Sequence, residues 1–243
     1  MKCQAYASET ELASAVACVL VDTIRRLPSV VLGLPTGRTP IAMYNELVRS
    51  TTTEEIDWFD VRTFNLDEFV GLGRGDPGSY RSFMEERLFS RVNIRERNIG
   101  FLDGKARDLA AECDRYERAI AAVGGIDVMV LGIGDNGHIG FNEPAENLVA
   151  RTHRVMLDEP TRAANALWFE GNLTRVPREA LTMGMGTILR ARSIVLIATG
   201  EPKAEVVSAM LYGGVTTLLP ASFLQLHPHV TVMLDKSLAD QLP

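Results

Sequence analysis

The sequence predicts an α/β fold with a mostly parallel sheet that is covered by helices on both faces. Short apolar runs rich in Val and Ile alternate along the chain with segments of helical period, and this alternation is typical of parallel sheets. With 243 residues, of which 46% are hydrophobic, the chain is large enough to bury a core. We find no internal repeat, low-complexity tract or long linker, so we expect a single domain over residues 1–243.

Each expected strand is a short apolar run bounded by Gly, Pro or Asp. The runs lie at residues 30–35, 61–67, 126–134, 180–186, 193–200 and 230–235. The expected helices lie before and between these runs and repeat their apolar residues at helical spacing. They cover residues 9–27, 39–50, 79–92, 106–123 and 201–213.

The first twenty residues fit a helix better than a signal peptide, because Glu9 and Glu11 fall where the apolar region would have to be. No apolar run approaches the ~20 residues that span a bilayer. Cys3, Cys18 and Cys113 are scattered without CxxC spacing, which is typical of free thiols in a reducing cytosol. We therefore expect a cytoplasmic protein with no membrane partner.

Charge and histidine content argue against two further classes of protein. A net charge of -6 and a pI near 5.3 are unlike the concentrated basic surface of a general nucleic-acid binder. The four histidines are dispersed, and His227 and His229 flank Pro228 without an obvious third ligand. We expect no metal site, and interpret this segment as a surface turn before the last strand.

Ligands of open parallel sheets bind beyond the carboxyl ends of the strands. Functional side chains are therefore expected in the loops that follow the strands. In the first loop, GLPTGRTP, Gly37 permits close backbone approach, Thr39 is a candidate N-cap and Pro40 suits the first helical position. A helix that begins here would point free N–H groups at the loop and favour an anion. The alternative is a well-capped helix with no ligand, and the loop is not a Walker A motif.

Two other strand ends carry charged residues. Lys203 falls in the first turn of the helix that follows Gly200 and Pro202, where its charge opposes the helix dipole unless an anion offsets it. Asp67 and Glu68 end another strand and point to opposite faces. One carboxylate is therefore free to face a crevice while the other serves the structure, although acidic residues at strand ends are often only turn formers.

The segment GIGDNGHIGFNEP, residues 132–144, is the strongest candidate for a catalytic loop. His138 lies in it between Gly137 and Gly140, which leave room beside its ring. An imidazole titrates near neutrality, as a general acid or base requires, and Glu143 could fix its tautomer. The alternative is a buried structural histidine, but a glycine loop offers little core to surround one.

Five segments together resemble the glucosamine-6-phosphate deaminase (glucosamine/galactosamine-6-phosphate isomerase) family. They are GLPTGRTP, FNLDEFVGL, GSYRSFM, GIGDNGHIGFNEP and LQLHP, in the family's order from about residue 31 to residue 227. The resemblance implies a single-domain, modified Rossmann-like fold without metal or organic cofactor. It also implies conversion of glucosamine 6-phosphate to fructose 6-phosphate and ammonia, in amino-sugar catabolism and N-acetylglucosamine utilisation.

The resemblance implies roles for individual residues of the catalytic group. Asp67 matches the family's enolising base, His138 its ring-opening acid/base, and Glu143 the carboxylate that positions this histidine. Asn136 falls in the ring-opening group, where relatives carry Asp or Asn. Asp135 precedes it, so a second acid is present one place early.

The resemblance also implies contacts to substrate. Gly37, Thr39 and Gly132 fall in substrate-contacting loops, and Lys203 matches a phosphate-binding lysine. Many members carry a further phosphate-binding arginine where this chain has Leu167. We expect Arg38, beside the first loop, to supply the missing charge, against the alternative that Arg38 points to solvent.

Three rival functions remain at this stage. Galactosamine 6-phosphate differs only at C4, and the sequence does not choose between the two sugars. The 6-phosphogluconolactonases share the fold, but lack the FNLDE strand end and continue differently after the glycine-histidine pair. A sugar-phosphate sensor of transcription would need a DNA-binding module, for which the α/β pattern leaves no room. The sequence is compatible with a monomer or a homo-oligomer.

Overall fold

The main sheet of the computed structural model, which describes all residues from Met1 to Pro243, has seven strands. In spatial order they are β1 (Lys2–Tyr6), β10 (Val230–Asp235), β9 (Ser193–Ala198), β6 (Val128–Leu131), β2 (Val31–Leu34), β3 (Arg62–Asn65) and β5 (Ile99–Gly100). Every neighbouring pair is parallel. The predicted mostly parallel α/β fold is therefore confirmed.

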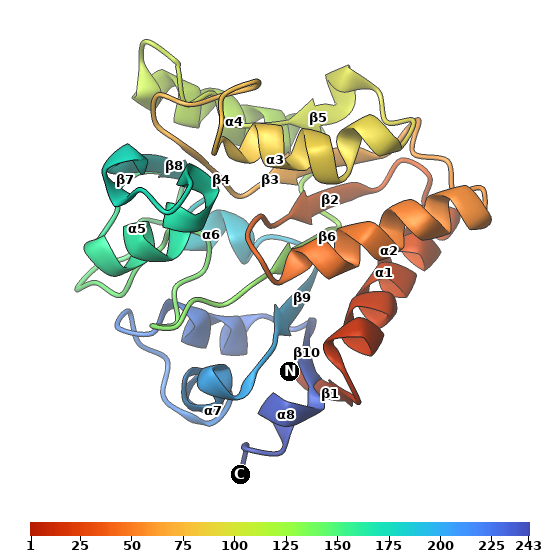
Figure 1. Cartoon of the computed structure of the whole chain (residues 1–243), viewed down its shortest axis with the longest axis vertical. Helices are drawn as coiled ribbons and strands as arrows, with labels where there is room; N and C mark the ends of the chain where they lie inside the picture. Colours follow the sequence, from red (N-terminus) through yellow and green to blue (C-terminus); the bar gives the residue numbers. More distant parts are fainter.

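Helices cover both faces of this sheet, as predicted (Figure 1). The longer helices are α1 (Glu9–Arg26), α2 (Pro40–Thr53), α3 (Tyr80–Arg87), α4 (Leu109–Ala122) and α7 (Ala204–Tyr212). Alternate strand residues supply two separate cores: Leu32 packs with α1 and α2, whereas its neighbour Val31 packs with α4 and α7. Strand side chains alternate between faces, so each buried strand needs apolar residues at every position.

A second, smaller sheet lies beside the main one and was not predicted. It consists of β4 (Asp67–Phe69), β8 (Glu179–Thr182) and β7 (His153–Met156), all antiparallel. The prediction of one strand over 61–67 was right for β3 but wrong at its end, because the chain leaves the main sheet at Leu66 and Asp67 begins β4. The prediction of a strand over 180–186 was also wrong in part, since the chain turns into α6 (Met185–Ile188). Short apolar runs do not distinguish one buried strand from two elements.

Other elements also escaped the sequence analysis. The first residues form the edge strand β1 and not a helix, because they pair with the free edge of β10. The remaining helices are α5 (Glu159–Asn165), α8 (Lys236–Ala239), η1 (Phe89–Arg91), η2 (Glu96–Asn98), η3 (Ala166–Phe169), η4 (Leu173–Arg175), η5 (Glu201–Lys203) and η6 (Pro220–Leu226).

His227 precedes β10, as expected, but it does not lie in a surface turn. Its side chain is buried, with Nε2 2.7 Å from the Ala191 carbonyl, so the expected surface turn was wrong at this residue.

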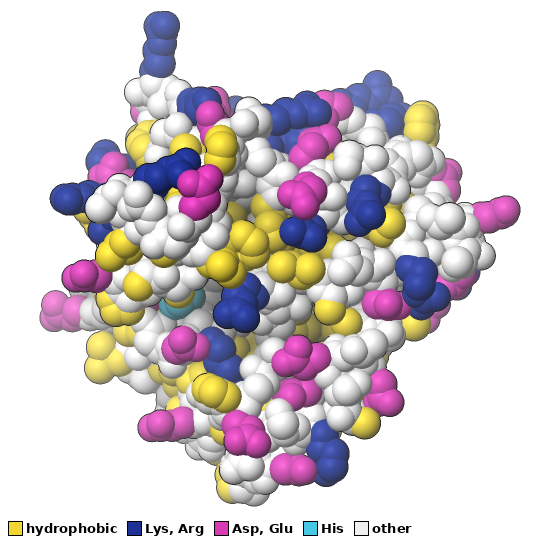
Figure 2. Space-filling model, in the orientation of Figure 1, with side chains coloured by type: hydrophobic (Ala, Val, Ile, Leu, Met, Phe, Trp, Pro, Cys, Tyr) yellow, Lys and Arg dark blue, Asp and Glu magenta, His cyan; other side chains and the backbone are white.

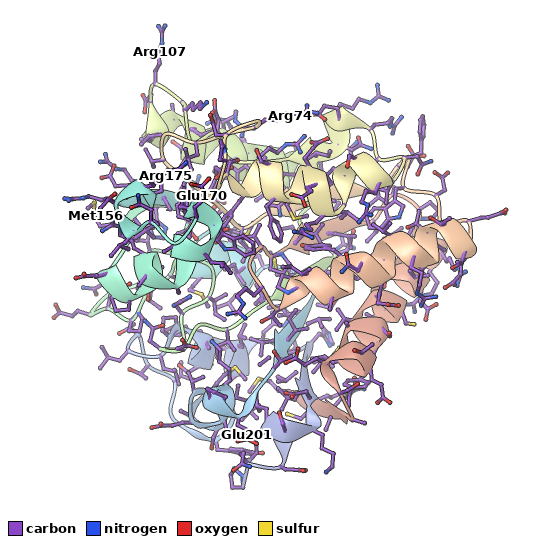
Figure 3. The ribbon with its side chains drawn as sticks, viewed as in Figure 1. Arg74, Arg107, Met156, Glu170, Arg175 and Glu201 are labelled. Carbon is purple, nitrogen blue, oxygen red and sulfur yellow. The ribbon has the colours of Figure 1, made fainter.

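The outer edges of the small sheet and its helices are visible in Figure 3. Met156 of β7 points to solvent with 63% of its surface exposed. Glu170, directly after η3, and Arg175, the last residue of η4, form an ion pair of 2.6 Å. Among the helices of this chain, none combines the length and the apolar character that a membrane crossing needs.

The strand order places the candidate loops next to one another. From β2 the chain moves outward to β3 and β5, whereas from β6 it moves the other way to β9 and β10. The order therefore reverses between β2 and β6, and such a switch point creates a crevice at the carboxyl ends of the strands. The four loops identified from the sequence follow four neighbouring strands: β9, β6, β2 and β3.

Candidate active site

Direct contacts join the candidate loops across the switch point. The Lys203 Nζ donates to the Ile133 carbonyl at 2.8 Å, which links the segment after β9 to the loop after β6. Gly140 of that loop lies so close to Asp67 that an added Cβ would stand 3.4 Å from Asp67 Oδ2. Figure 2 shows a histidine beside basic side chains in the recessed middle of this face.

Asp67 is a buried carboxyl group with an unused oxygen. It begins β4 opposite Thr182 of β8, only 5% of it is exposed, and its Oδ1 has no hydrogen-bond partner in the protein. Burial raises the pKa of Asp67 to about 8, with a further increase from Glu68 and a partial decrease from the Thr36 hydroxyl. A carboxyl group in this setting is a strong base once ionised.

Glu68 points the other way and holds the structure together. Its carboxylate accepts from the Ser79 hydroxyl at 2.8 Å and from the backbone N–H groups of Tyr80 and Arg81 at 3.0 and 2.9 Å. These bonds cover the N-terminal end of α3, where a negative charge is favourable. The predicted division of the Asp67 and Glu68 side chains between two environments agrees with these contacts.

The imidazole of His138 is held in one orientation by Asn136. The His138 Nδ1 lies 2.7 Å from Asn136 Oδ1, which also accepts from the His138 backbone N–H at 3.1 Å. An amide oxygen only accepts, so this network assigns the proton to Nδ1 and leaves Nε2 free. The ring is therefore prepared to exchange a proton through Nε2.

Glu143 completes this cluster from the end of the same loop. Its Oε2 accepts from Asn136 Nδ2 at 2.7 Å and lies 3.3 Å from His138 Nδ1, and its Oε1 accepts from the Thr161 hydroxyl at 2.5 Å. Burial raises the pKa of Glu143, but the interactions with His138, Thr161 and Asn136 outweigh it and lower the pKa to about 2. Glu143 is thus a permanent negative charge beside the ring.

A different glycine from those expected makes room for the imidazole. A Cβ added to Gly134 would stand 2.1 Å from the His138 ring, whereas one on Gly137 would meet Leu219 and one on Gly140 would meet Thr182. The expectation for Gly137 and Gly140 was therefore wrong. Both have positive φ, at 84° and 59°, and serve the turns of the loop instead.

Lys203 lies in η5 with most of its side chain covered. Besides the Ile133 carbonyl, its Nζ contacts Asp135 Oδ1 at 2.5 Å. From the sequence, a bound phosphate was expected to offset a lysine in the first turn of this helix. In the structure the Asp135 carboxylate offsets it, and its hydrogen bond to Lys203 lowers the pKa of Asp135.

The loop after β2 is open to solvent. Gly37 has a φ of 101°, a backbone conformation that only glycine adopts easily, and it faces open space. Pro40 occupies the first turn of α2 as expected, but Thr39 has helical dihedrals and its side chain caps nothing, so the expected cap was wrong. The first N–H groups of α2 consequently have no side-chain partner. Arg38 is exposed and makes no ion pair or side-chain hydrogen bond, and Gly132 also borders open space.

The segment of Leu167 contributes no cation to the site. Leu167 is 59% exposed in η3. Arg162, in the preceding α5, donates instead to the carbonyls of Leu173 and Val176 at 2.9 and 3.0 Å.

One contributor to the cluster was missed in the sequence. Thr161 reaches Glu143 from α5, and Asp158 caps this helix by accepting from the Thr161 N–H at 2.8 Å. Asp158 as N-cap, followed by Glu159 and Pro160 in the first turn, is a helix-start signal that would have located α5. It would not have shown that Thr161 meets Glu143. Groups of three or more His, Cys, Asp or Glu side chains arranged to hold a metal ion do not occur in the structure.

Comparison with known proteins places these residues in a family. Residues 4–233 match the sequence model of the family described as glucosamine-6-phosphate isomerases/6-phosphogluconolactonase.

The chain belongs to this family.

Within the family, one branch is far more similar to the chain than the other. The glucosamine-6-phosphate deaminase of Thermoanaerobacter pseudethanolicus is 45% identical over 233 residues, which cover 96% of this chain and 92% of that protein. A solved structure described as a monomeric glucosamine-6-phosphate deaminase superposes with a TM-score of 0.96 at 43% identity and covers 99% of this chain and 100% of the other. The 6-phosphogluconolactonase of Trypanosoma cruzi reaches a TM-score of 0.76 at 23% identity, over 98% and 96% of the chains, and so shares the fold.

Proposed function

We propose that this protein converts glucosamine 6-phosphate and water into fructose 6-phosphate and ammonia. Two groups around one loop carry the proposal. The first is the buried base Asp67 with its free oxygen, and the second is the His138 imidazole, which is held through its Nδ1. An aldose–ketose conversion needs both groups, since one opens the ring and the other moves a proton between carbons. The 45% identity to a glucosamine-6-phosphate deaminase supports the same assignment.

Ring opening is the first step that we assign. The His138 Nε2 takes the proton of the anomeric hydroxyl and returns a proton to the ring oxygen as the C1–O5 bond breaks. Asn136 and Glu143 keep Nδ1 occupied, so that only Nε2 exchanges protons. The negative charge of Glu143 stabilises the imidazolium form during this exchange.

Proton transfer between carbons is the second step. Asp67 removes the C2 proton of the open-chain amino aldehyde and delivers it to C1. In the same conversion the amino nitrogen loses one proton and the C1 oxygen gains one, which leaves an imine at C2 and a hydroxyl at C1. Water adds to that imine, and the C2–N bond breaks to release ammonia and form the ketone. The raised pKa of Asp67 suits a group that both accepts and returns a proton.

The phosphate end of the substrate is assigned to the open side of the site. Lys203, the uncapped N-terminus of α2 and the loop with Gly37, Arg38 and Thr39 offer positive charge and N–H donors there. Gly132 leaves space for the sugar between them. These groups would hold the sugar in position for both proton transfers.

The sequence-level rivals differ in how well the site supports them. A lactonase hydrolyses an ester and moves no proton between carbons, so it does not need a carboxyl group that accepts a proton from one carbon and returns it to another. Galactosamine 6-phosphate would meet the same acid and base, so this sugar stays the second candidate. We place the enzyme in the cytoplasm, as its free cysteines suggested, and favour a monomer because the similar solved structure is described as monomeric.

A substrate panel tests the proposal. The purified protein is incubated with glucosamine 6-phosphate, galactosamine 6-phosphate or 6-phosphogluconolactone, and ammonia and fructose 6-phosphate are measured separately. We expect equimolar ammonia and fructose 6-phosphate from the first sugar. Hydrolysis of the lactone without ammonia release from either amino sugar would overturn the assignment.

A further inference from the structure

The ammonium group of Lys203 is already occupied before any substrate arrives. Two of its three N–H donors have partners, the Ile133 carbonyl at 2.8 Å and Asp135 Oδ1 at 2.5 Å. Both partners belong to the loop that carries His138. A phosphate that binds Lys203 must therefore share it with Asp135 or replace Asp135.

The two partners of Lys203 differ in how firmly they are held. Ile133 is buried directly after β6, so its carbonyl is part of the rigid sheet end. The Asp135 side chain is 86% exposed and has no second hydrogen-bond donor. Because the Asp135 side chain is in solvent, water competes for its carboxylate and screens its attraction to Lys203. Asp135 is consequently the replaceable partner.

We propose that Asp135 is a counterion gate of the anion site: its carboxylate neutralises Lys203 in the free protein and is displaced by the phosphate dianion of the substrate. The inference rests on the proposed function and adds a residue that determines which anions enter. A dianion brings two charges and three acceptor oxygens to replace one carboxylate. A monoanion only replaces one charge with another and gains little.

The gate also connects the phosphate to the histidine. Asp135 lies between Gly134, on which the imidazole rests, and Asn136, which holds His138 Nδ1. The turn is closed by the Gly134 N–H to the His138 carbonyl and the Gly137 N–H to the Gly134 carbonyl, both at 3.0 Å. A displacement of the Asp135 side chain therefore takes place within the same turn that positions the catalytic ring.

Direct titration of inorganic phosphate tests the gate without any turnover. Calorimetric titration at pH 8 compares the full-length wild type with Asp135→Asn, which keeps the shape and removes the charge. We expect the variant to bind phosphate roughly three- to tenfold more tightly, the range for losing a nearby, partly screened negative charge. The KM for glucosamine 6-phosphate should fall by the same factor, and Asp135→Glu should restore wild-type phosphate affinity.

Two matched variants identify the route of the effect. Asp114→Asn removes the same charge from another exposed ion pair, with Arg151 on the α4 side, and should leave phosphate affinity unchanged. In a Lys203→Gln background, Asp135→Asn should no longer tighten phosphate binding.

The proposed gate is wrong if Asp135→Asn does not tighten phosphate binding, if Asp114→Asn tightens it equally, or if the gain persists without Lys203. Absence of ammonia release by the wild type would instead refute the proposed function, because the titration requires no reaction.

Discussion

Asp67 and Glu143 carry the same chemical group in opposite environments, although Glu143 belongs to the loop that follows β6 and Asp67 lies against that loop. Asp67 is enclosed by the two sheets with one oxygen unpaired, and burial raises its pKa to about 8. Glu143 is also desolvated, but bonds from Thr161 and Asn136 and the nearby His138 lower its pKa to about 2. The comparison teaches that burial alone does not set a carboxyl pKa: at Glu143 the hydrogen bonds and the charge of neighbouring groups outweigh desolvation, whereas at Asp67 they do not.

This difference separates the two carboxyl groups by function. Glu143 stays ionised at every physiological pH and orients a neighbour. Asp67 changes its protonation close to neutral pH, as a group that accepts and returns a proton must. Residues whose environments push their pKa values apart are the expected acid, base and orienting groups of an active site.

The largest expected effect comes from removing the base. Asp67→Asn should reduce kcat by about 10⁴-fold or more, since it deletes the only assigned C2 base while barely changing volume. Binding of glucosamine 6-phosphate, measured by calorimetry, should remain within a few-fold of wild type. Turnover close to that of wild type would show that the buried carboxyl group is structural.

His138→Gln should be the next most damaging change in the comparison. General acid–base assistance is typically worth about 10²–10⁴-fold, and we expect a loss of that size from the cyclic substrate. An open-chain analogue should lose much less, because it needs no ring opening. Equal losses for both substrates, measured as kcat/KM, would contradict the assigned role.

The two carboxyl groups should influence stability with opposite dependence on pH. Asp67 has a folded pKa of about 8 against an ordinary value of 3.8. The native state therefore holds its proton more tightly, and stability falls as pH rises from about 4 to about 8. Glu143 has a folded pKa of about 2 against an ordinary value of 4.5. Its contribution is complete above pH 4.5 and is lost as pH falls towards 2.

Urea unfolding of wild type, Asp67→Asn and Glu143→Gln at pH 3, 5, 7 and 9 measures this difference. Asp67→Asn should gain stability relative to wild type between pH 5 and pH 9, by roughly 2–4 kcal/mol. Glu143→Gln should be less stable than wild type at pH 7, with a deficit that shrinks below pH 4.5. Parallel curves for the two variants would show that their environments do not differ as described.

The smallest expected effect concerns the phosphate end, where neither carboxyl group acts. Arg38→Ala should raise the KM for glucosamine 6-phosphate about tenfold, corresponding to roughly 1.5–3 kcal/mol for a hydrogen bond to a charged group. The kcat should change little, because this contact binds ground state and transition state alike. An unchanged KM would mean that the exposed Arg38 side chain stays in solvent and that Lys203 and the α2 N-terminus suffice.

Much of the site could be predicted because its chemistry is local in the chain. The loop from Gly132 to Pro144 carries His138, Asn136 and Glu143 within eight residues, so their contact follows from short-range geometry. The phosphate expected next to Lys203 stays a prediction. The Asp135 carboxylate that contacts Lys203 was not expected, since the two residues are separated by almost seventy positions.

Errors in the fold arose where one pattern is compatible with two structures. The residues on both sides of Leu66 are buried, so no exposed turn residue marks the point where the chain changes sheet. Only the partner strands β2 and β8 distinguish the halves. The edge strand β1 is almost entirely exposed, so it lacks the apolar pattern that reveals buried strands. Pairing with β10 decides its conformation.

By itself, the sequence determined the alternation of helices and strands, the family and the residues with suitable chemistry, because periodicity, glycine placement and side-chain type are properties of neighbouring positions. Only the tertiary structure decided that four loops converge at the switch point, that Gly134 supports the imidazole, and that Thr161 and Asp135 complete the site. It also decided the opposite pKa shifts of Asp67 and Glu143. The physical reason is that desolvation and hydrogen bonding depend on atoms supplied by residues far apart in the chain.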